Sequence, residues 1–334
     1  MTGRERVSAI VAGEKPDHCG FWLGMPHSET WPIYLEHFGF SEQEELRRFL
    51  CDDIRWFVAD YAYEHPEGKR LFNAVRTGIS EAAAPVFADC EDPAEVEDHD
   101  WPNPDYFNFS GALSSLRNAG EVYRASGMWC CFFHIVADYF GMENYFVKMY
   151  THPEVVDAVT DRVCEFYYEA NERFFELAKD EVDCFFLGND YGTQLDLMIS
   201  PQAFGRFILP WTKKLVDQGH AHGYQVMHHC CGAVHKIIPR FIEAGVDALH
   251  PLQALACDMD AETLARDFGG KIAFVGGIDT QRLLMRGTPE QVKAEVRRVK
   301  SILGPNLVVS PSHEALLPNV PPENVLAMAE ATRE

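Results

Sequence analysis

The chain has 334 residues, of which 47% are hydrophobic and 24% charged, so it can build a sizeable core and is not a disordered protein. Its formal net charge is −22, from 51 acidic and 29 basic residues, and this opposes contact with nucleic acid or an anionic membrane surface. We therefore expect neither nucleic acid nor a membrane among its partners.

The sequence also indicates the cellular compartment of the protein. Residues 1–6 lack the apolar core of a signal peptide, and no run of about 18 apolar residues occurs. The chain has 10 cysteines, several of them in apolar surroundings, for example Cys51, Cys164 and Cys184. In a long chain without a signal, this usage is typical of reduced thiols, and we expect a cytoplasmic protein.

The first half of the chain has few regular patterns. Residues 19–24 and 122–129 predict strands, and apolar residues at helical spacing predict a long helix over 154–179. No shift in composition marks a boundary between domains. We therefore expect one domain that spans residues 1–334.

The second half alternates short apolar segments with amphipathic ones. Strands are predicted at 184–188, 224–229, 247–250, 272–276 and 307–310, and helices at 201–222, 233–244, 261–268, 288–303 and 321–334. This alternation indicates parallel strands with crossover helices. An open doubly wound sheet is the alternative, but no Gly-x-Gly-x-x-Gly follows an early strand.

We therefore predict an α/β fold, a single distorted (β/α)8 TIM-type barrel with the active site at the C-terminal ends of its strands. The acidic, proline-containing stretch 85–108 is then expected to be a surface excursion over the barrel mouth. Every predicted strand of the second half ends in a polar cluster, and these clusters are 189–194, 228–232, 250–253, 276–280 and 310–314.

The cluster after the strand at 224–229 points to a metal. Residues i and i+2 of a strand face the same side, so His229 and Cys231 are expected to point one way, and His228 and Cys230 the other. An imidazole beside a thiol suits zinc. With His313, these residues form a predicted set of three ligands that leaves a fourth position open. The alternative is an ordinary core cysteine and loop histidine.

Acidic residues at the other strand ends offer further chemistry. Asp190, Asp279 and Glu314 are alternative metal ligands, or partners that orient a ligating imidazole. For Asp190 and Asp279, helix capping or a turn hydrogen bond is the competing interpretation. For Gln253, the competing interpretation is a hydrogen bond to the barrel backbone.

In this order, several segments resemble signatures of the uroporphyrinogen decarboxylase superfamily. They are 6–17, 189–194, 229–232, 251–253, 276–279 and 322–324. The resemblance covers essentially the whole chain and implies a distorted barrel with its site in a cleft at the C-terminal mouth. It also implies one of two chemistries, which are cofactor-free decarboxylation of a porphyrinogen and corrinoid-dependent methyl transfer aided by zinc.

The N-terminal region favours the methyltransferase branch. Porphyrinogen decarboxylases carry arginines there, which bind the many substrate carboxylates. Residues 16–46 of this chain contain neither Lys nor Arg and are rich in aromatic side chains. His229-x-Cys231 is similar to the His-x-Cys of the methyltransferases. His313 stands where their thiol-methylating members have a further cysteine.

The resemblance leads to a hypothesis of function. We expect a zinc-dependent methyltransferase that moves a methyl group from a small methylated substrate to a corrinoid (cobalamin) carried by a partner protein. Asp190 or Glu314 would donate or accept a proton, and Asp279 completes the candidate catalytic set. A second copy of the chain is a further possible partner, since homodimers occur among similar proteins.

The aromatic residues suggest the substrate class. Trp22, Trp31, Gln194 and Gln253 are the candidate substrate-binding residues, and flat apolar walls suit an aryl methyl ether, whose reaction is O-demethylation. Two alternatives remain. One is a cofactor-free decarboxylase of a less charged acid, with Asp190 or His313 as proton donor. The other is a non-catalytic protein that delivers a corrinoid or tetrapyrrole.

Overall fold

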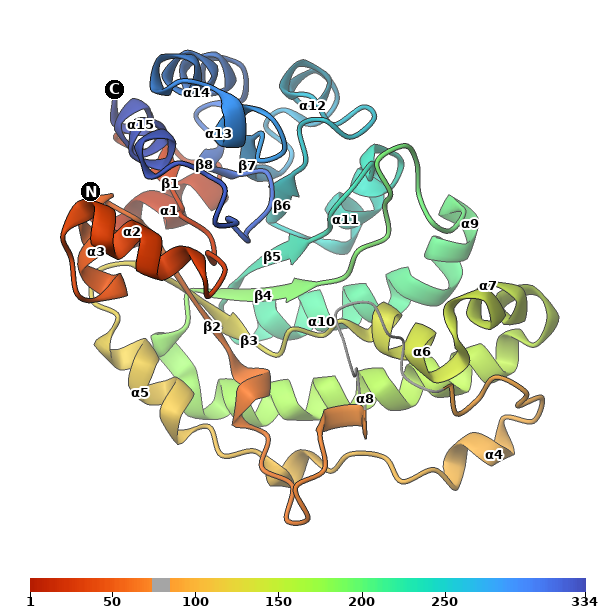
Figure 1. Cartoon of the computed structure of the whole chain (residues 1–334). Coiled ribbons are helices and arrows are strands. Elements are labelled where there is room, and N and C mark those ends of the chain that lie inside the picture. Colours follow the sequence, from red (N-terminus) through yellow and green to blue (C-terminus); the bar gives the residue numbers. More distant parts are fainter. Residues whose placement is uncertain (74–84) are drawn as a thin grey trace.

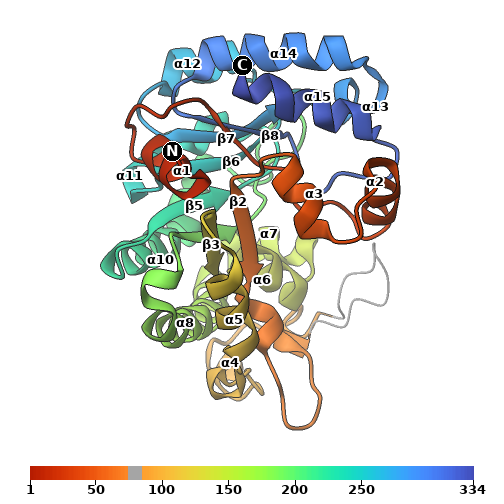
Figure 2. The same cartoon turned by 90° about the vertical axis from the view of Figure 1, so that its left-hand side faces the viewer.

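The computed structural model describes residues 1–73 and 85–334. In these residues, parallel strands form one eight-stranded sheet in the order β1-β8-β7-β6-β5-β4-β3-β2. The strands are β1 (Gly20–Phe21), β2 (Ile54–Val58), β3 (Tyr123–Gly127), β4 (Cys184–Gly188), β5 (Gln225–His229), β6 (Ala248–Leu252), β7 (Ala273–Ile278) and β8 (Leu307–Pro311). The sheet curls into a nearly closed barrel (Figures 1 and 2), so the predicted (β/α)8 TIM-type fold is confirmed.

Helices connect the strands and lie outside the sheet (Figure 1). They are α1 (Gly3–Val11), α2 (Thr30–Phe38), α3 (Gln43–Phe49), α4 (Ala94–Glu97), α5 (Ser110–Asn118), α6 (Phe132–Phe140), α7 (Met142–Thr151), α8 (Pro153–Ala178), α9 (Pro201–Ala203), α10 (Leu209–Ala221), α11 (Ile238–Ala244), α12 (Ala261–Phe268), α13 (Leu283–Arg286), α14 (Pro289–Leu303) and α15 (Pro322–Arg333). Among the described residues, no helix combines the length and apolar character needed to cross a lipid bilayer.

One buried cluster fills the inside of the barrel. Its members come from alternate positions of the strands, as expected when every second side chain points inward. The small residues Cys184, Ala248 and Ala273 leave room there for the large rings of Trp22 and Phe186. Helix α1 adds apolar residues to the same cluster, so it packs against the N-terminal ends of the strands. The opposite, C-terminal end is left for polar side chains.

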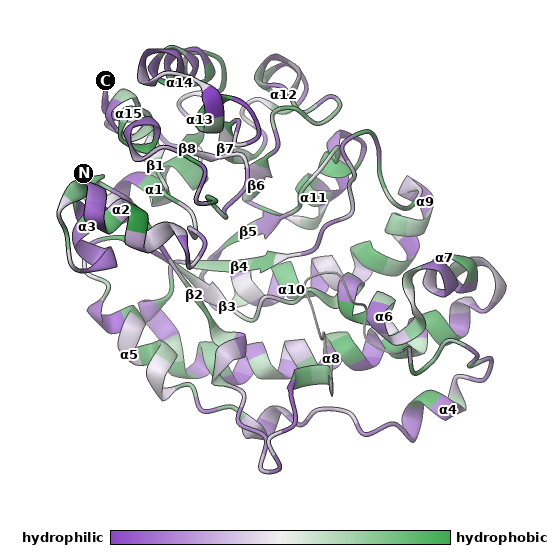
Figure 3. Ribbon diagram, viewed as in Figure 1, coloured by the Kyte–Doolittle hydropathy of each residue, from purple (hydrophilic) through white to green (hydrophobic). Residues whose placement is uncertain are grey.

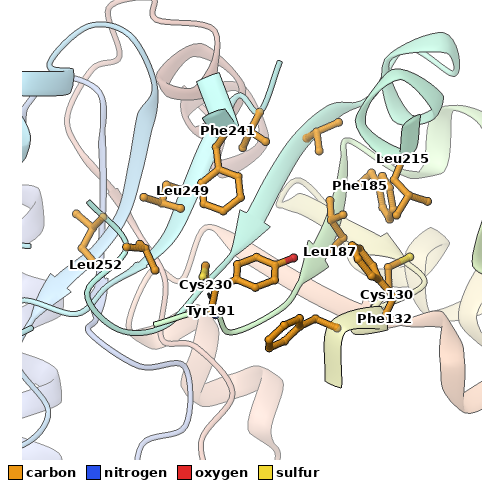
Figure 4. Packing of buried hydrophobic residues seen from close by; sticks show 14 of the residues in the cluster. Cys130, Phe132, Phe185, Leu187, Tyr191, Leu215, Cys230, Phe241, Leu249 and Leu252 are labelled. Atoms are coloured by element: carbon orange, nitrogen blue, oxygen red, sulfur yellow. Dashed lines mark hydrogen bonds between the residues drawn. The ribbon is translucent and has the colours of Figure 1, made fainter. Parts of the chain in front are cut away.

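A larger buried cluster lies between the strands and the surrounding helices. Figure 4 shows part of it, with Phe185 and Leu187 of β4 near Leu215 of α10, and Leu249 of β6 near Phe241 of α11. The helices that cover it carry apolar and hydrophilic residues in alternation, as α8 does in Figure 3. This pattern is typical of helices that bury one face.

Two strands of the first half differ from the sequence prediction. β1 has two residues instead of six, and Gly24 turns the chain with a φ of 78° against the backbone of Glu314. A Cβ at Gly24 would lie 2.4 Å from the Glu314 carbonyl oxygen, so only glycine fits. β2 was not predicted, although Ile54 and Trp56 belong to the barrel interior.

The stretch 85–108 is more than a surface excursion. Phe87, Cys90 and Val96 are buried, and the Phe87 N–H donates to the Tyr139 carbonyl of α6 at 2.8 Å. The Lys148 ammonium of α7 donates to the Cys90 carbonyl at 2.6 Å. The stretch is therefore fixed to helices α6 and α7 by buried contacts.

Asp53 links β1 to β2 at the place where these two strands do not pair as a ladder. Its carboxylate accepts hydrogen bonds from the Phe21 N–H at 2.9 Å and from the Arg6 guanidinium at 2.7 Å, and its own N–H donates to the Phe21 carbonyl at 2.9 Å. Arg6 also pairs with Asp17, whose side chain is 36% exposed.

We expect Asp53→Ala to lower the free energy of unfolding by about 3–5 kcal/mol, because it leaves buried partners of the carboxylate unpaired. Asp17→Ala is the matched control, since it removes an exposed partner of the same Arg6 and should cost about 1 kcal/mol or less. Urea unfolding at neutral pH measures both values. Equal losses in the two variants would contradict the role of Asp53 in closing the barrel.

Candidate metal centre

The C-terminal ends of β4, β5 and β6 bring polar residues together around His229. His229 is the last residue of β5, in register with Gly188 of β4 and His250 of β6. Its side chain is 4% exposed, and its ring lies 5.1 Å from that of Trp129, centroid to centroid. The imidazole is therefore held in a fixed, mostly dry place at the barrel mouth.

The Nε2 side of His229 faces a thiol and a carboxylate. The distance from Nε2 to Cys231 Sγ is 3.4 Å, and that to Asp190 Oδ1 is 3.3 Å. The same Asp190 oxygen accepts the Cys231 N–H at 2.8 Å. Strand-end geometry thus places the two residues of the His-x-Cys pattern side by side, as the sequence predicts.

The Nδ1 side of His229 faces a second donor set. His250 Nδ1 lies 3.0 Å from His229 Nδ1, and Glu314 Oε2 lies 3.8 Å from it. Among the described residues, two groups can hold a metal ion, and His229 belongs to both. One is Asp190, His229 and Cys231, and the other is His229, His250 and Glu314.

The first group fits zinc. Bonds of about 2.3 Å to sulfur and about 2.0–2.1 Å to nitrogen or oxygen, at tetrahedral angles, give a sulfur–nitrogen separation of about 3.5 Å and a nitrogen–oxygen separation of about 3.3 Å. The observed separations from His229 Nε2 are 3.4 Å to Cys231 Sγ and 3.3 Å to Asp190 Oδ1. A thiol, an imidazole and a carboxylate are each ligands that zinc binds, and three protein ligands are usual for a catalytic zinc site.

The electrostatics of the cluster favour a bound cation. Burial, together with the charges of Asp190 and Glu314, raises the pKa of the Cys231 thiol far above its usual range. Burial acts to raise the pKa of Asp190 too, but the hydrogen bond with His229 lowers it below its usual value. Burial opposes the charge on His229, yet the two carboxylates raise its pKa. A metal cation between these groups would compensate the carboxylates and deprotonate the thiol.

His228 and Cys230 point away from the cluster, as the alternation of a strand predicts. The His228 ring lies 4.5 Å from that of Phe241 in the layer between strands and helices, and burial lowers its pKa to about 3. Cys230 is buried beside Tyr191 (Figure 4), whose N–H is 3.4 Å from its sulfur. Neither side chain is therefore available to the metal group.

Close backbone packing holds the loop that carries Cys231. Gly232 has a φ of 89°, and a Cβ there would lie 2.5 Å from the backbone of Gly192. Its N–H donates to the side-chain oxygen of Gln253 at 2.6 Å. Gln253 thus binds backbone, which is the competing interpretation that the sequence left open for it.

His313 and Asp279 lie outside both metal groups formed by the described residues. His313 is 44% exposed, and its Nδ1 accepts the Ala315 N–H at 3.1 Å. The Asp279 carboxylate accepts three backbone N–H groups at 2.8–2.9 Å, from residues 281–283 before and at the start of α13. Asp279 therefore caps this turn, as the competing interpretation states.

Of the four predicted substrate-binding residues, two contact residues of the cluster or its loop and two lie away from it. Trp22 lies inside the barrel with its ring 4.9 Å from that of His250, and Gln253 supports the Cys231 loop. Trp31 is buried beneath the Arg47 guanidinium, 5.1 Å from the ring centroid, and Gln194 is exposed. In residues 1–73 and 85–334, neither Trp31 nor Gln194 shares a hydrogen bond or ring contact with the metal group.

The structure gives several residues contacts that the sequence analysis did not assign to them. His250 was noticed only as part of a polar strand end, and its contact with His229 depends on the register of β5 and β6. Trp129 and Asp60 follow β3 and β2, and the Trp129 N–H donates to Asp60 Oδ2 at 2.7 Å. The sequence signal that could have identified them is the presence of aromatic and acidic residues at the end of each strand.

Asp60 carries a strongly perturbed carboxyl group. Burial raises its pKa to about 6, against the hydrogen bond from Trp129. The unfolded chain has a pKa near 4, so the native state binds more protons between these values, and stability falls as the pH rises through this window. We expect Asp60→Asn to gain roughly 2 kcal/mol relative to wild type between about pH 4 and pH 7.5. Thermal unfolding of both proteins at several pH values measures this difference in stability. The same dependence of stability on pH in both proteins would contradict the prediction.

A cleft of about 510 Å³ lies beside the barrel mouth, lined by β2, α5 and the segment after β1. Met25, Trp56, Phe57 and Tyr61 form its apolar walls. The Trp56 ring lies 4.8 Å from that of Trp129, which in turn contacts His229. This volume is in the usual range of small-molecule sites.

The fold and the site define a (β/α)8 barrel with a histidine–cysteine–carboxylate cluster at its C-terminal mouth. The chain belongs to the uroporphyrinogen decarboxylase (URO-D) family, whose model matches residues 77–334. Curated uroporphyrinogen decarboxylases of Citrifermentans bemidjiense and Geotalea daltonii are 26% identical over 185 residues and 27% identical over 187 residues. These matches cover 54% of the chain and 50% of each relative, so the chain spans about half the length of the curated relatives that it matches.

A solved structure, a methyltransferase from Methanosarcina mazei, has the same fold. It superposes with a TM-score of 0.72 at 16% identity, covering 99% of this chain and 98% of the other. At this identity, the likeness supports the barrel fold alone.

Proposed function

We propose that this protein is a zinc-dependent methyltransferase that moves a methyl group from a small methylated substrate to a corrinoid carried by a partner protein. The observation that carries the proposal is the placement of Cys231 Sγ and Asp190 Oδ1 at 3.4 and 3.3 Å from His229 Nε2. Both distances are close to those expected between two ligands of one tetrahedral zinc ion, and a set of three ligands leaves one position open for a substrate.

In this proposal, His229, Cys231 and Asp190 hold the metal. Bound zinc supplies a Lewis acid at the heteroatom that carries the methyl group. The bond between this heteroatom and the methyl carbon would break with its electron pair on the heteroatom. The methyl group would pass to a reduced corrinoid, whose cobalt would supply the electron pair of the new bond. Glu314, whose Oε2 has no hydrogen-bond partner among the described residues, gives the departing heteroatom its proton.

The cleft beside the mouth supports an aryl methyl ether as substrate, with O-demethylation as the reaction. Its walls contain Trp56, Phe57 and Tyr61, and flat rings pack well against such walls. The ring contacts from Trp56 through Trp129 to His229 connect the cleft with the metal group. The corrinoid protein would then dock over the barrel mouth.

The test is an assay of methoxyarenes with the purified protein and reduced cobalamin, before and after removal of metal by a chelator. We expect a demethylated phenol and methylcobalamin in equal amounts, loss of both after chelation, and recovery when zinc is added. Liquid chromatography with mass spectrometry quantifies both products. No demethylation of any substrate across a broad panel of methyl ethers, methylamines and methyl thiols would overturn the proposal.

A cofactor-free decarboxylase of a less charged acid is the second candidate, and Asp60 is the observation that favours it. A carboxyl group with a pKa of about 6 at a strand end is suited to donate a proton to the carbon that loses carbon dioxide. A polyanionic substrate suits the protein poorly, because the guanidinium groups of Arg47 and Arg55 are already paired with Asp52 and Glu44. This candidate predicts carbon dioxide release that is unchanged by chelation.

A further inference from the structure

His250 contacts the imidazole at the centre of the cluster on the side away from Cys231. Its Nδ1 lies 3.0 Å from His229 Nδ1, and both residues are buried. We propose that His250 is a positioning residue that holds the proton of His229 on Nδ1, so that Nε2 presents its lone pair to zinc. This inference rests on the proposed zinc site and adds a residue outside its ligand set.

The number of hydrogens on the two rings decides whether His229 Nε2 can bind a metal. Two neutral imidazoles that meet nitrogen to nitrogen share one hydrogen between those nitrogens. If His250 donates, His229 carries its own hydrogen on Nε2, which then points at Asp190 and Cys231 and blocks the metal position. If His229 donates, Nε2 is free to bind. Metal binding therefore requires His250 to accept, and a ligating histidine commonly has such an acceptor behind it.

His250 is better placed for this task than the nearby carboxylate. Glu314 Oε2 lies 3.8 Å from His229 Nδ1, beyond hydrogen-bond distance, whereas His250 Nδ1 lies at 3.0 Å. The rings of Trp22 and Phe186, with centroids 4.9 and 5.4 Å from that of His250, hold its orientation.

The second ring nitrogen of His250, Nε2, does not fix the tautomer of this residue. In the described part of the chain, His250 Nε2 has no hydrogen-bond partner, so no second contact dictates which of its nitrogens carries the hydrogen. His250 can thus adopt the tautomer that His229 needs when a metal binds. A water molecule or the π-face of a neighbouring ring would suffice for the hydrogen on Nε2.

The test compares zinc affinity in His250→Asn, His250→Gln and His250→Leu by competition with a chromophoric chelator. Asn places its amide oxygen near the position of Nδ1, whereas Gln places it near that of Nε2, and Leu has no acceptor. We expect His250→Asn to bind zinc within about threefold of wild type, and the Gln and Leu variants about 10–100-fold more weakly. His228→Leu is the matched control, since His228 is a buried histidine of the neighbouring strand β5 whose ring packs against Phe241, away from the metal group.

Cobalt(II) substitution adds a readout of the site itself. The absorption bands of a thiolate-bound cobalt ion should persist in His250→Asn with their wild-type energies. Equal zinc affinity in the Asn, Gln and Leu variants would overturn the role of His250. A loss of zinc affinity in His228→Leu as large as that in His250→Leu would overturn it too. A wild-type protein that binds no zinc would overturn both this inference and the proposed function. Zinc binding with the expected order of variants, but no methyl transfer, would overturn the reaction alone.

Discussion

Cys231→Ala is expected to lower zinc affinity by at least about 100-fold and to remove detectable methyl transfer, because it deletes the only thiol in the metal groups of the described residues. The sulfur lies 3.4 Å from His229 Nε2, and without it only the imidazole and the Asp190 carboxylate remain. Inductively coupled plasma mass spectrometry of the purified variant measures the metal content directly. Stoichiometric zinc in the variant would rule out Cys231 as a ligand.

Cys230→Ala is the matched control for this experiment. Cys230 has the same chemistry one residue earlier, but its thiol is buried in the hydrophobic layer beside Tyr191. We expect full zinc content and a loss of about 1 kcal/mol in the free energy of unfolding, from the small cavity that alanine leaves. Loss of zinc in Cys230→Ala with retention in Cys231→Ala would exchange the roles of the two cysteines.

Asp190 is expected to have two separable roles, as a metal ligand and as an anchor for the backbone of Cys231. Its Oδ1 lies 3.3 Å from His229 Nε2 and accepts the Cys231 N–H at 2.8 Å. Asp190→Asn retains an acceptor for the N–H but removes the negative charge. Asp190→Ala removes both.

We expect both variants to bind zinc about 10–100-fold more weakly than wild type, and only Asp190→Ala to lose about 1–2 kcal/mol of stability as well. Chelator competition measures the affinity, and urea unfolding of the metal-free proteins measures the stability. Wild-type zinc affinity in Asp190→Asn would show that the carboxylate serves the backbone alone.

The regular second half of the chain was predictable because both of its signals are local. Apolar segments of strand length alternate with amphipathic helices, and β5 and α14 begin within one residue of their predicted positions. The alternation of a strand also separated His229 and Cys231 from His228 and Cys230 without any knowledge of tertiary structure. The first half was less predictable, since β1 is two residues long and β2 carries the charged Arg55.

The third member of the candidate metal group, Asp190, could not be selected from the sequence alone. His313, Asp190, Asp279 and Glu314 all follow strands, and from spacing alone each was a candidate ligand. The structure brings Asp190 to His229 Nε2, uses Asp279 to cap a turn and leaves His313 outside the group. The conformation of the loops determines which of these residues lies beside His229. This conformation depends on long-range contacts such as those between Gly192 and Gly232.

The sequence by itself determined the barrel, the end of the barrel where polar residues gather, and the His-x-Cys pair, because each depends on periodicity or on spacing within one strand. Only the tertiary structure decided what lies on either side of His229. The register between β5 and β6 sets His250 against its Nδ1, and the loop after β4 sets Asp190 against its Nε2. Contacts of this kind join residues far apart in the chain, and no local pattern encodes them.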